Sequence, residues 1–157
     1  MREPIEGESN AEGLRFAVVA SRFNDEIVNG LLDGAMECLR QHGAGSEAVR
    51  ICRVPGAFEI PLAAAALAKS GQFDAIVAIG ALVRGDTPHF DFISLQVTME
   101  ISRVARNSGV PVAYGVITCN TMEQAKARSG TGGGNKGWEA ALAAIEMASL
   151  MKQLNAL

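Results

Sequence analysis

The chain has 157 residues, the size of one domain, and 48% of them are hydrophobic, which is enough for one sizeable core. Charged residues make up 20% and the formal net charge is -3, with no basic stripe, so nucleic acid is not an expected partner. The longest apolar run, Ile60–Ala68, is far shorter than the ~20 residues that span a bilayer, which argues against a membrane protein.

Residues 1–13 (MREPIEGESNAEG) are polar and lack the apolar centre of a signal peptide. The three cysteines, Cys38, Cys52 and Cys119, are an odd number without a C-x-x-C pair, which argues against a disulfide framework and a zinc site. We therefore expect an extended polar segment over 1–13, a single domain over 14–157, and a reducing, cytoplasmic location.

Four apolar runs have the composition of strands. Two of them are nearly continuous Val, Ile and Ala, which is typical of strands covered on both faces by helices. The predicted strands are Leu14–Ala20, Ala48–Val54, Asp74–Val83 and Val110–Thr118.

Segments with helical periodicity lie between and after these runs. The predicted helices are Ile27–Leu39, Phe58–Ser70, a stretch that follows Asp91 and stops before Gly109, a short helix from Thr121 to Gly130, and Gly137–Leu154. Strands that alternate with helices require right-handed crossovers and a parallel sheet. The sequence thus predicts an α/β fold, a three-layer α/β/α sandwich around a four-stranded parallel sheet of the flavodoxin-like kind.

Ligands of such sheets bind beyond the carboxyl ends of the strands. The segments to inspect are therefore Ser21–Asp25, Pro55–Glu59, Arg84–Asp91 and Cys119–Thr121. The first of them has no glycine, so the dinucleotide fingerprint G-x-G-x-x-G is absent there, and no P-loop motif occurs in the chain. We expect neither a nicotinamide nor a P-loop nucleotide site.

Two of these segments contain a side chain for which both a structural and a functional interpretation are open. Phe23 either offers a face on which a flat heterocycle can stack or caps the core, and the sequence leaves both interpretations open. Glu59 stands in the first turn of a predicted helix, where the helix dipole alone favours a carboxylate, although it also suits a polyhydroxylated ligand.

The third segment is the most informative, because His89 follows a buried strand together with Arg84, Asp86 and Thr87. Histidine exchanges protons near neutral pH without special tuning, so we favour a functional role for His89. The other histidine, His42, precedes a glycine and is expected only to cap a helix. We do not expect a metal site, because the chain has only two histidines and no other ligand at the usual spacing.

Near the C-terminus, Arg128 and Lys136 flank a glycine-rich stretch ahead of a helix. Exposed backbone N–H groups and two cations could bind an anion such as phosphate, although a flexible turn with solvated charges is the favoured reading. Cys119 has no evident base partner, so we interpret it as a small residue at a strand end. Trp138 is interpreted as a packing residue.

Several segments carry a closer resemblance: SRFN (21–24), VPGAFEIP (54–61), GALVRGDTPHFDFI (80–93), PVAYGVITCNTMEQAKARSG (111–130) and GNKGWEAALAAIEM (134–147). In order and spacing, residues 14–154 resemble the lumazine synthase family. The resemblance implies a transferase without a cofactor, which condenses 5-amino-6-(D-ribitylamino)uracil with 3,4-dihydroxy-2-butanone 4-phosphate and releases phosphate and water. This is the penultimate step of riboflavin synthesis.

The resemblance also implies roles for particular residues. Phe23 stacks on the pyrimidine; Ala57, Phe58 and Glu59 hold the ribityl chain; Ala81, Leu82 and Val83 contact the ring; Asp86 and Thr87 bind the butanone phosphate; His89 transfers protons; and Tyr114, Arg128 and Lys136 reach in from the adjacent subunit.

The family forms homo-oligomers, so the resemblance implies a pentamer, allows a sixty-subunit shell and leaves an association with riboflavin synthase open. The length of Arg128–Lys136 is that of shell-forming members. Two positions depart from the family pattern: Tyr114 stands where phenylalanine is usual, and Glu100 lies near a usual glycine.

The main alternative is a non-catalytic flavodoxin-like module, either a flavin carrier or a regulatory domain, which shares the order of strands and helices. A receiver domain would need an acidic cluster after the first strand, and Ser21–Asp25 lacks one. A scaffold protein that has lost catalysis is a second alternative, and the presence of His89 and Arg128 argues against it.

Overall fold

The computed structural model describes residues 1–131 and 133–157. Its main elements are β1 (Phe16–Ser21), α1 (Asp25–Gln41), β2 (Val49–Val54), α2 (Ile60–Lys69), β3 (Ala75–Val83), α3 (His89–Ser108), β4 (Val112–Cys119), α4 (Met122–Ser129) and α5 (Lys136–Asn155). Short 3-10 helices at Ser46–Ala48 and Ala57–Glu59 precede β2 and α2. The predicted elements are all present, with their ends shifted by a few residues.

The largest difference concerns the start of α3, which begins at His89 and not after Asp91 as predicted. Pro88 occupies the position before the helix, where its fixed φ of -70° suits a helix start and its missing N–H costs no hydrogen bond. His89 is therefore the first residue of a helix and not a loop residue.

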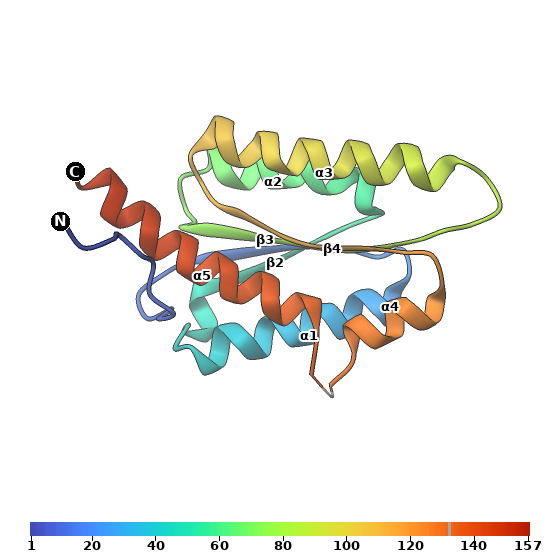
Figure 1. Ribbon diagram of the computed structural model, residues 1–157, viewed down its shortest axis with the longest axis horizontal. Helices are drawn as coiled ribbons and strands as arrows, with labels where there is room; N and C mark the ends of the chain where they lie inside the picture. Colours follow the sequence, from blue (N-terminus) through green and yellow to red (C-terminus); the bar gives the residue numbers. More distant parts are fainter. Residues whose placement is uncertain (132) are drawn as a thin grey trace.

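The four strands form one parallel sheet in the order β2-β1-β3-β4. Figure 1 shows α2 and α3 on one face of the sheet and α1, α4 and α5 on the other, which confirms the predicted three-layer α/β/α architecture. In the same view the carboxyl ends of the strands point to the right, and both chain termini lie at the left.

The central strands β1 and β3 are buried along nearly their whole length, as their continuous apolar composition predicts. Phe16, Leu31 and Ile145 belong to a core cluster on the α1 and α5 side. Val19 and Ile60 belong to a second cluster under α2 and α3. Each such side chain contributes about 1.5–3 kcal/mol by leaving water. No helix in the described part of the chain is long and apolar enough to cross a membrane.

The packing of α5 on α1 depends on glycine and on one asparagine. A Cβ atom at Gly137 would overlap the backbone of Leu31. Beside it, the Asn135 Oδ1 atom accepts hydrogen bonds from the backbone N–H groups of Gly137 (2.9 Å) and Trp138 (3.1 Å), which caps α5. The Asn135 Nδ2 atom donates to the Gly30 carbonyl of α1 at 2.9 Å. The start of α5 is therefore fixed against α1.

We expect Gly137→Ala to lower the free energy of unfolding by roughly 1–3 kcal/mol, because the added methyl meets backbone that cannot move aside. The ~1 kcal/mol that alanine gains in helix propensity is too small to offset this. Urea denaturation measures the change. Gly45→Ala is the matched control, since a Cβ at Gly45 has nothing within 4 Å. Equal stability of the two variants would contradict the close contact.

Cys38 is buried on the inner face of α1, and burial raises the pKa of its thiol to about 11. The thiol Sγ lies 3.6 Å from Nδ1 of His42, whose ring also hydrogen-bonds the Cys38 carbonyl at 2.7 Å. This second contact confirms that His42 caps the end of α1. The ring of Trp138 packs against His42, with ring centroids 6.0 Å apart.

The raised pKa of Cys38 predicts a loss of stability in alkali. In the unfolded chain the thiol ionises from about pH 9, whereas in the folded chain it stays neutral up to about pH 11, so raising the pH across that window favours unfolding. The urea midpoint should therefore decrease less between pH 8 and pH 10.5 for Cys38→Ala than for the unaltered chain. Cys52→Ala serves as the control, because Cys52 is only partly buried. If the urea midpoint of Cys38→Ala decreases as much as that of the unaltered chain, the loss of stability does not come from the Cys38 thiol.

Candidate functional site

The sheet topology leaves a crevice beside the end of β1. From β1 the chain proceeds to β2 on one side, while β3 pairs with β1 on the other, so the segments that follow β1 and β3 diverge. A cleft of about 470 Å³ opens there. It is lined by Phe23, Asn24, Pro55, Gly56, Ala57, Phe58, Glu59, Ala81, Leu82, Val83, Gly85, Thr87, His89, Phe90 and Ile93.

The cleft brings together almost every residue assigned above to one subunit. The cleft is lined by Phe23, residues 57–59, residues 81–83, Thr87 and His89. Asp86 is exposed and does not line it. Sequence reasoning did not single out Asn24, Phe90 or Ile93, the first of which stands in the SRFN segment.

Phe23 is presented to the cleft by a tightly held turn. Its side chain is 71% exposed, so it does not cap the core of its own chain, and its ring can be reached from the cleft. Backbone hydrogen bonds from Arg22 to the Val54 carbonyl (2.8 Å) and from Phe23 to the Pro55 carbonyl (3.1 Å) join this turn to the end of β2. A rigid aromatic face at a cleft is suited to a flat heterocycle.

Asn24 explains how the turn after β1 reverses. Its backbone has φ 60°, a left-handed conformation that asparagine tolerates better than most residues. Its side-chain Nδ2 donates to the Ala81 carbonyl of β3 at 3.0 Å. The turn is thus tied both to β2 and to β3, and Phe23 is held between them.

Glu59 has the structural role that its position predicted. One carboxylate oxygen, Oε2, accepts a hydrogen bond from the backbone N–H of Gly56 at 3.0 Å and so closes the turn ahead of α2. The residue also lines the cleft, so the carboxylate is positioned by the turn and reachable from the cleft. The two readings of Glu59 are compatible.

His89 is exposed at the cleft as the first residue of α3. Over residues 1–131 and 133–157 its imidazole forms no hydrogen bond with another side chain or with the backbone. The ring is therefore available to a ligand, and its place is set by the backbone of the first turn of α3.

Tyr114, Arg128 and Lys136 do not line the cleft of their own chain. The Tyr114 hydroxyl hydrogen-bonds Thr98 Oγ1 of α3 at 2.8 Å, so the group that phenylalanine would lack has a partner. Arg128 donates to the Gln124 carbonyl at 3.0 Å, and Lys136 pairs with Glu139 at 2.8 Å.

Cys119 is buried at the end of β4. Burial raises the pKa of its thiol, and the positive charge of Arg128 opposes this only in part. A neutral buried thiol is a poor nucleophile, which supports the interpretation of Cys119 as a small strand-end residue. The described residues contain no group of three or more His, Cys, Asp or Glu side chains that could hold a metal ion.

Comparison with known proteins gives the affiliation of this chain. The family model for 6,7-dimethyl-8-ribityllumazine synthase matches residues 13–152. A curated protein named 6,7-dimethyl-8-ribityllumazine synthase from Aquifex aeolicus (strain VF5) is 52% identical over 149 residues, which cover 95% of this chain and 97% of that protein. With a family match over most of its length and a relative this similar, the chain belongs to the 6,7-dimethyl-8-ribityllumazine synthase family.

Proposed function

We propose that this chain is a transferase that condenses 5-amino-6-(D-ribitylamino)uracil with 3,4-dihydroxy-2-butanone 4-phosphate to give 6,7-dimethyl-8-ribityllumazine, phosphate and water. The observation that carries the proposal is the cleft in this family member, where the exposed ring of Phe23, the carboxylate of Glu59 and the imidazole of His89 meet. These groups suit a flat ring, a polyol chain and proton transfer.

The reaction needs positioning and proton transfer more than any other chemistry. The 5-amino group attacks the ketone to give a carbinolamine, and loss of water gives an imine. Phosphate then leaves by elimination, and the enol that results tautomerises to a ketone. The ribityl-bearing nitrogen attacks this ketone and closes the ring with loss of a second water. Electrons balance without an external oxidant or reductant. His89 is the group we assign to the proton transfers.

In this assignment the pyrimidine stacks on Phe23, while Ala81, Leu82 and Val83 contact its edge. The ribityl chain lies along residues 57–59, where Glu59 accepts from a hydroxyl. Thr87 lines the cleft, and Asp86 precedes it in the exposed segment between β3 and α3, just outside the lining. We assign this segment to the phosphate ester.

The cleft of a single chain is incomplete for the phosphate. An organic phosphate carries about -1.5 to -2 charge at pH 7, yet the described residues that line the cleft include no lysine or arginine. We propose that Arg128 and Lys136 of an adjacent copy supply the positive charge and that Tyr114 of that copy completes the wall.

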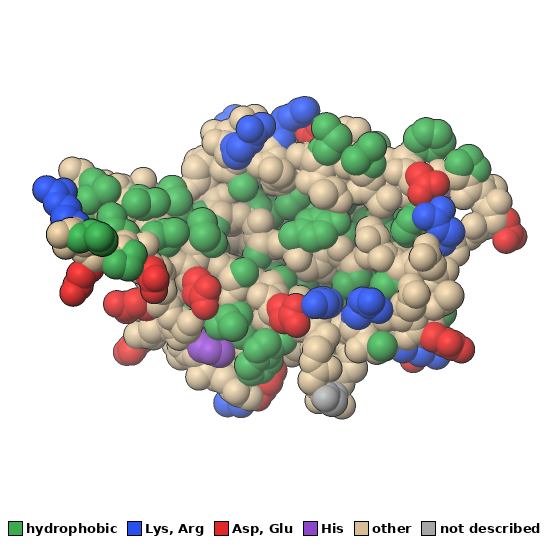
Figure 2. Space-filling view, viewed as in Figure 1, with side chains coloured by type: hydrophobic (Ala, Val, Ile, Leu, Met, Phe, Trp, Pro, Cys, Tyr) green, Lys and Arg blue, Asp and Glu red, His purple; other side chains and the backbone are tan. Residues whose placement is uncertain are grey.

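Exposed apolar side chains support an assembly of several copies. Leu62 of α2 is 78% exposed and Phe92 of α3 is 72% exposed. Leu95 and Met99, one and two turns further along α3, are also exposed. Figure 2 shows hydrophobic side chains at the surface along the top of the view, over the layer formed by α2 and α3. Burying such a face against another copy is favourable.

We propose a homo-oligomer built of pentamers, with the sixty-subunit shell as its larger form. Light scattering separates the two directly, and a monomer in solution would contradict the shared site. Association with riboflavin synthase is a further proposal, which co-purification from the source cell tests. A cytoplasmic location is supported by the three free thiols, Cys38, Cys52 and Cys119.

The decisive experiment mixes the purified protein with both substrates and follows lumazine fluorescence together with inorganic phosphate. Both should rise in equal amounts. A non-catalytic flavin carrier would instead be yellow on purification and release no phosphate from the butanone substrate.

We expect His89→Ala to lower kcat by roughly 10²-fold and to leave both KM values nearly unchanged. Proton transfer by a positioned side chain contributes about 10²–10⁴-fold, and holding two reactants together contributes at least as much, so a slow enzyme should remain. The other histidine, in His42→Ala, is the control and should keep kcat. Complete loss of turnover by His89→Ala, with both substrates still bound, would show that positioning is the minor contribution.

We expect Arg128→Ala to raise the KM of the butanone phosphate by roughly ten- to a hundred-fold. A hydrogen bond to a charged group contributes about 1.5–3 kcal/mol, and ~1.4 kcal/mol corresponds to a factor of ten. The KM of the pyrimidine should stay constant. Lys126→Ala, on the same helix, is the control. An unchanged KM for the butanone phosphate would remove Arg128 from the site.

A further inference from the structure

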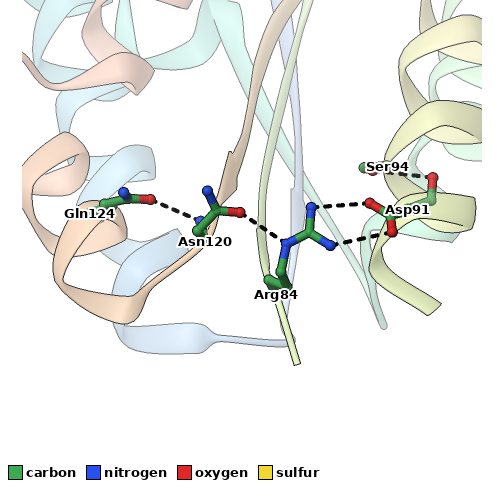
Figure 3. Close-up of polar contacts among 5 residues, drawn as sticks. All are labelled: Arg84, Asp91, Ser94, Asn120 and Gln124. Carbon is green, nitrogen blue, oxygen red and sulfur yellow. Dashed lines mark hydrogen bonds and ion pairs between the residues drawn. The ribbon is translucent and has the colours of Figure 1, made fainter. Parts of the chain in front are cut away.

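Arg84, directly after β3, joins two loops that the sequence does not bring together. Figure 3 shows its guanidinium between Asn120 at the end of β4 and Asp91 in the first turn of α3. Nε donates to Asn120 Oδ1 at 2.9 Å, while Nη1 and Nη2 donate to the two carboxylate oxygens of Asp91 at 3.3 and 3.1 Å. The carbon of the guanidinium also lies 4.5 Å from the centroid of the Phe90 ring.

The Asn120 side of this bridge is firmly anchored. The backbone N–H of Arg84 donates to the Cys119 carbonyl at 2.9 Å, so the arginine is held to β4 as well as β3. The backbone N–H of Asn120 donates to Gln124 Oε1 at 2.8 Å, which fixes the start of α4. The guanidinium therefore extends from a framework that includes two strands.

The Asp91 side is the first turn of α3, which the Pro88 carbonyl closes by accepting a hydrogen bond from the backbone N–H of Asp91 at 3.0 Å. Pro88 forms no side-chain cap on α3. The Asp91 carboxylate, which could cap the helix, is turned to Arg84. His89 and Phe90 belong to the same turn, so contacts that Arg84 makes with Phe90 and Asp91 fix the backbone next to His89. Since no other described residue bonds the imidazole, this backbone decides where it lies.

We propose that Arg84 is a positioning residue that holds His89 in place for proton transfer. The inference rests on the role proposed for His89. Simple stabilisation is an inadequate account of the bridge, because the side chains of Arg84 and Asp91 are 43% and 58% exposed, and exposed ion pairs contribute little to folding. Direct phosphate binding is disfavoured, because Nε, Nη1 and Nη2 already have partners and one face of the guanidinium is covered by Phe90.

The role requires arginine in particular. A planar guanidinium can donate two parallel bonds to one carboxylate, a third bond to an amide oxygen, and stack on an aromatic ring at the same time. Lysine keeps the charge but cannot make this set of contacts. The conservative variant Arg84→Lys therefore separates a need for geometry from a need for charge.

The test is a double-variant cycle on kcat with Arg84→Ala, His89→Ala and the two combined. We expect Arg84→Ala to lower kcat by roughly tenfold with both KM values within about twofold, since displacement by ~1 Å can cost up to ~10²-fold. In the His89→Ala background the same change should have no further effect. Arg84→Lys should lose about as much as Arg84→Ala, and Asp91→Asn should lose part of it.

The control is Arg40→Ala, which breaks another exposed arginine–carboxylate pair, with Glu37 of α1, and should leave kcat and both KM values unchanged. Circular dichroism and light scattering verify that each variant keeps its fold and assembly. Arg84→Lys and Asp91→Asn keep the test decisive should Arg84→Ala fail to fold.

Three outcomes would overturn the inference. The first is an equal loss of kcat with and without His89, the second is full activity of Arg84→Lys, and the third is a rise only in the KM of the butanone phosphate. An inactive unaltered protein would contradict the proposed function and this inference together, whereas an active protein whose Arg84 variants keep their kcat contradicts this inference alone.

Discussion

The burial of β1 and β3 on both faces is the constraint on which the rest of the molecule depends. Strands covered by helices on each side can carry little except apolar residues, and the burial of these two strands is nearly complete. Polar side chains are therefore displaced to the segments beyond the strand ends. Because the strands are parallel, the segments that follow them meet at one edge of the sheet. The position of the cleft follows from the core.

Ser21 marks the boundary between this core and the cleft. It is the last residue of β1, it is buried, and its hydroxyl has no hydrogen-bond partner in the part of the chain that the structure describes. A Cβ atom at Gly80 of β3 would lie 3.2 Å from that hydroxyl. Two residues later, the chain presents the exposed ring of Phe23. The change from buried core to cleft surface thus takes place over one turn, which is held by Asn24 and by backbone hydrogen bonds to the end of β2.

Most of the fold could be predicted from the sequence, because the strand and helix patterns are local. The predicted start of α3 was too late. The polar segment between β3 and Asp91 is typical of a loop, whereas the helix begins directly after Pro88. The sequence could not show whether Phe23 caps the core, because the exposure of its side chain depends on the turn built by Asn24. The bridge from Asn120 through Arg84 to Asp91 spans three elements, and no periodicity encodes such a contact. The residues that we propose an adjacent copy contributes are likewise not encoded by any local pattern.

The two ends of the chain lie together, far from the cleft. Glu8 donates its backbone N–H to Ser149 Oγ at 3.0 Å, and Gln153 Nε2 donates to the Glu6 carbonyl at 2.7 Å, so the N-terminal segment runs along the last turns of α5. Both ends emerge at the amino edge of the sheet, opposite the edge that holds the cleft (Figure 1). A peptide or protein genetically joined to either end would leave the molecule on the side away from the cleft, and a short linker could close the chain into a circle.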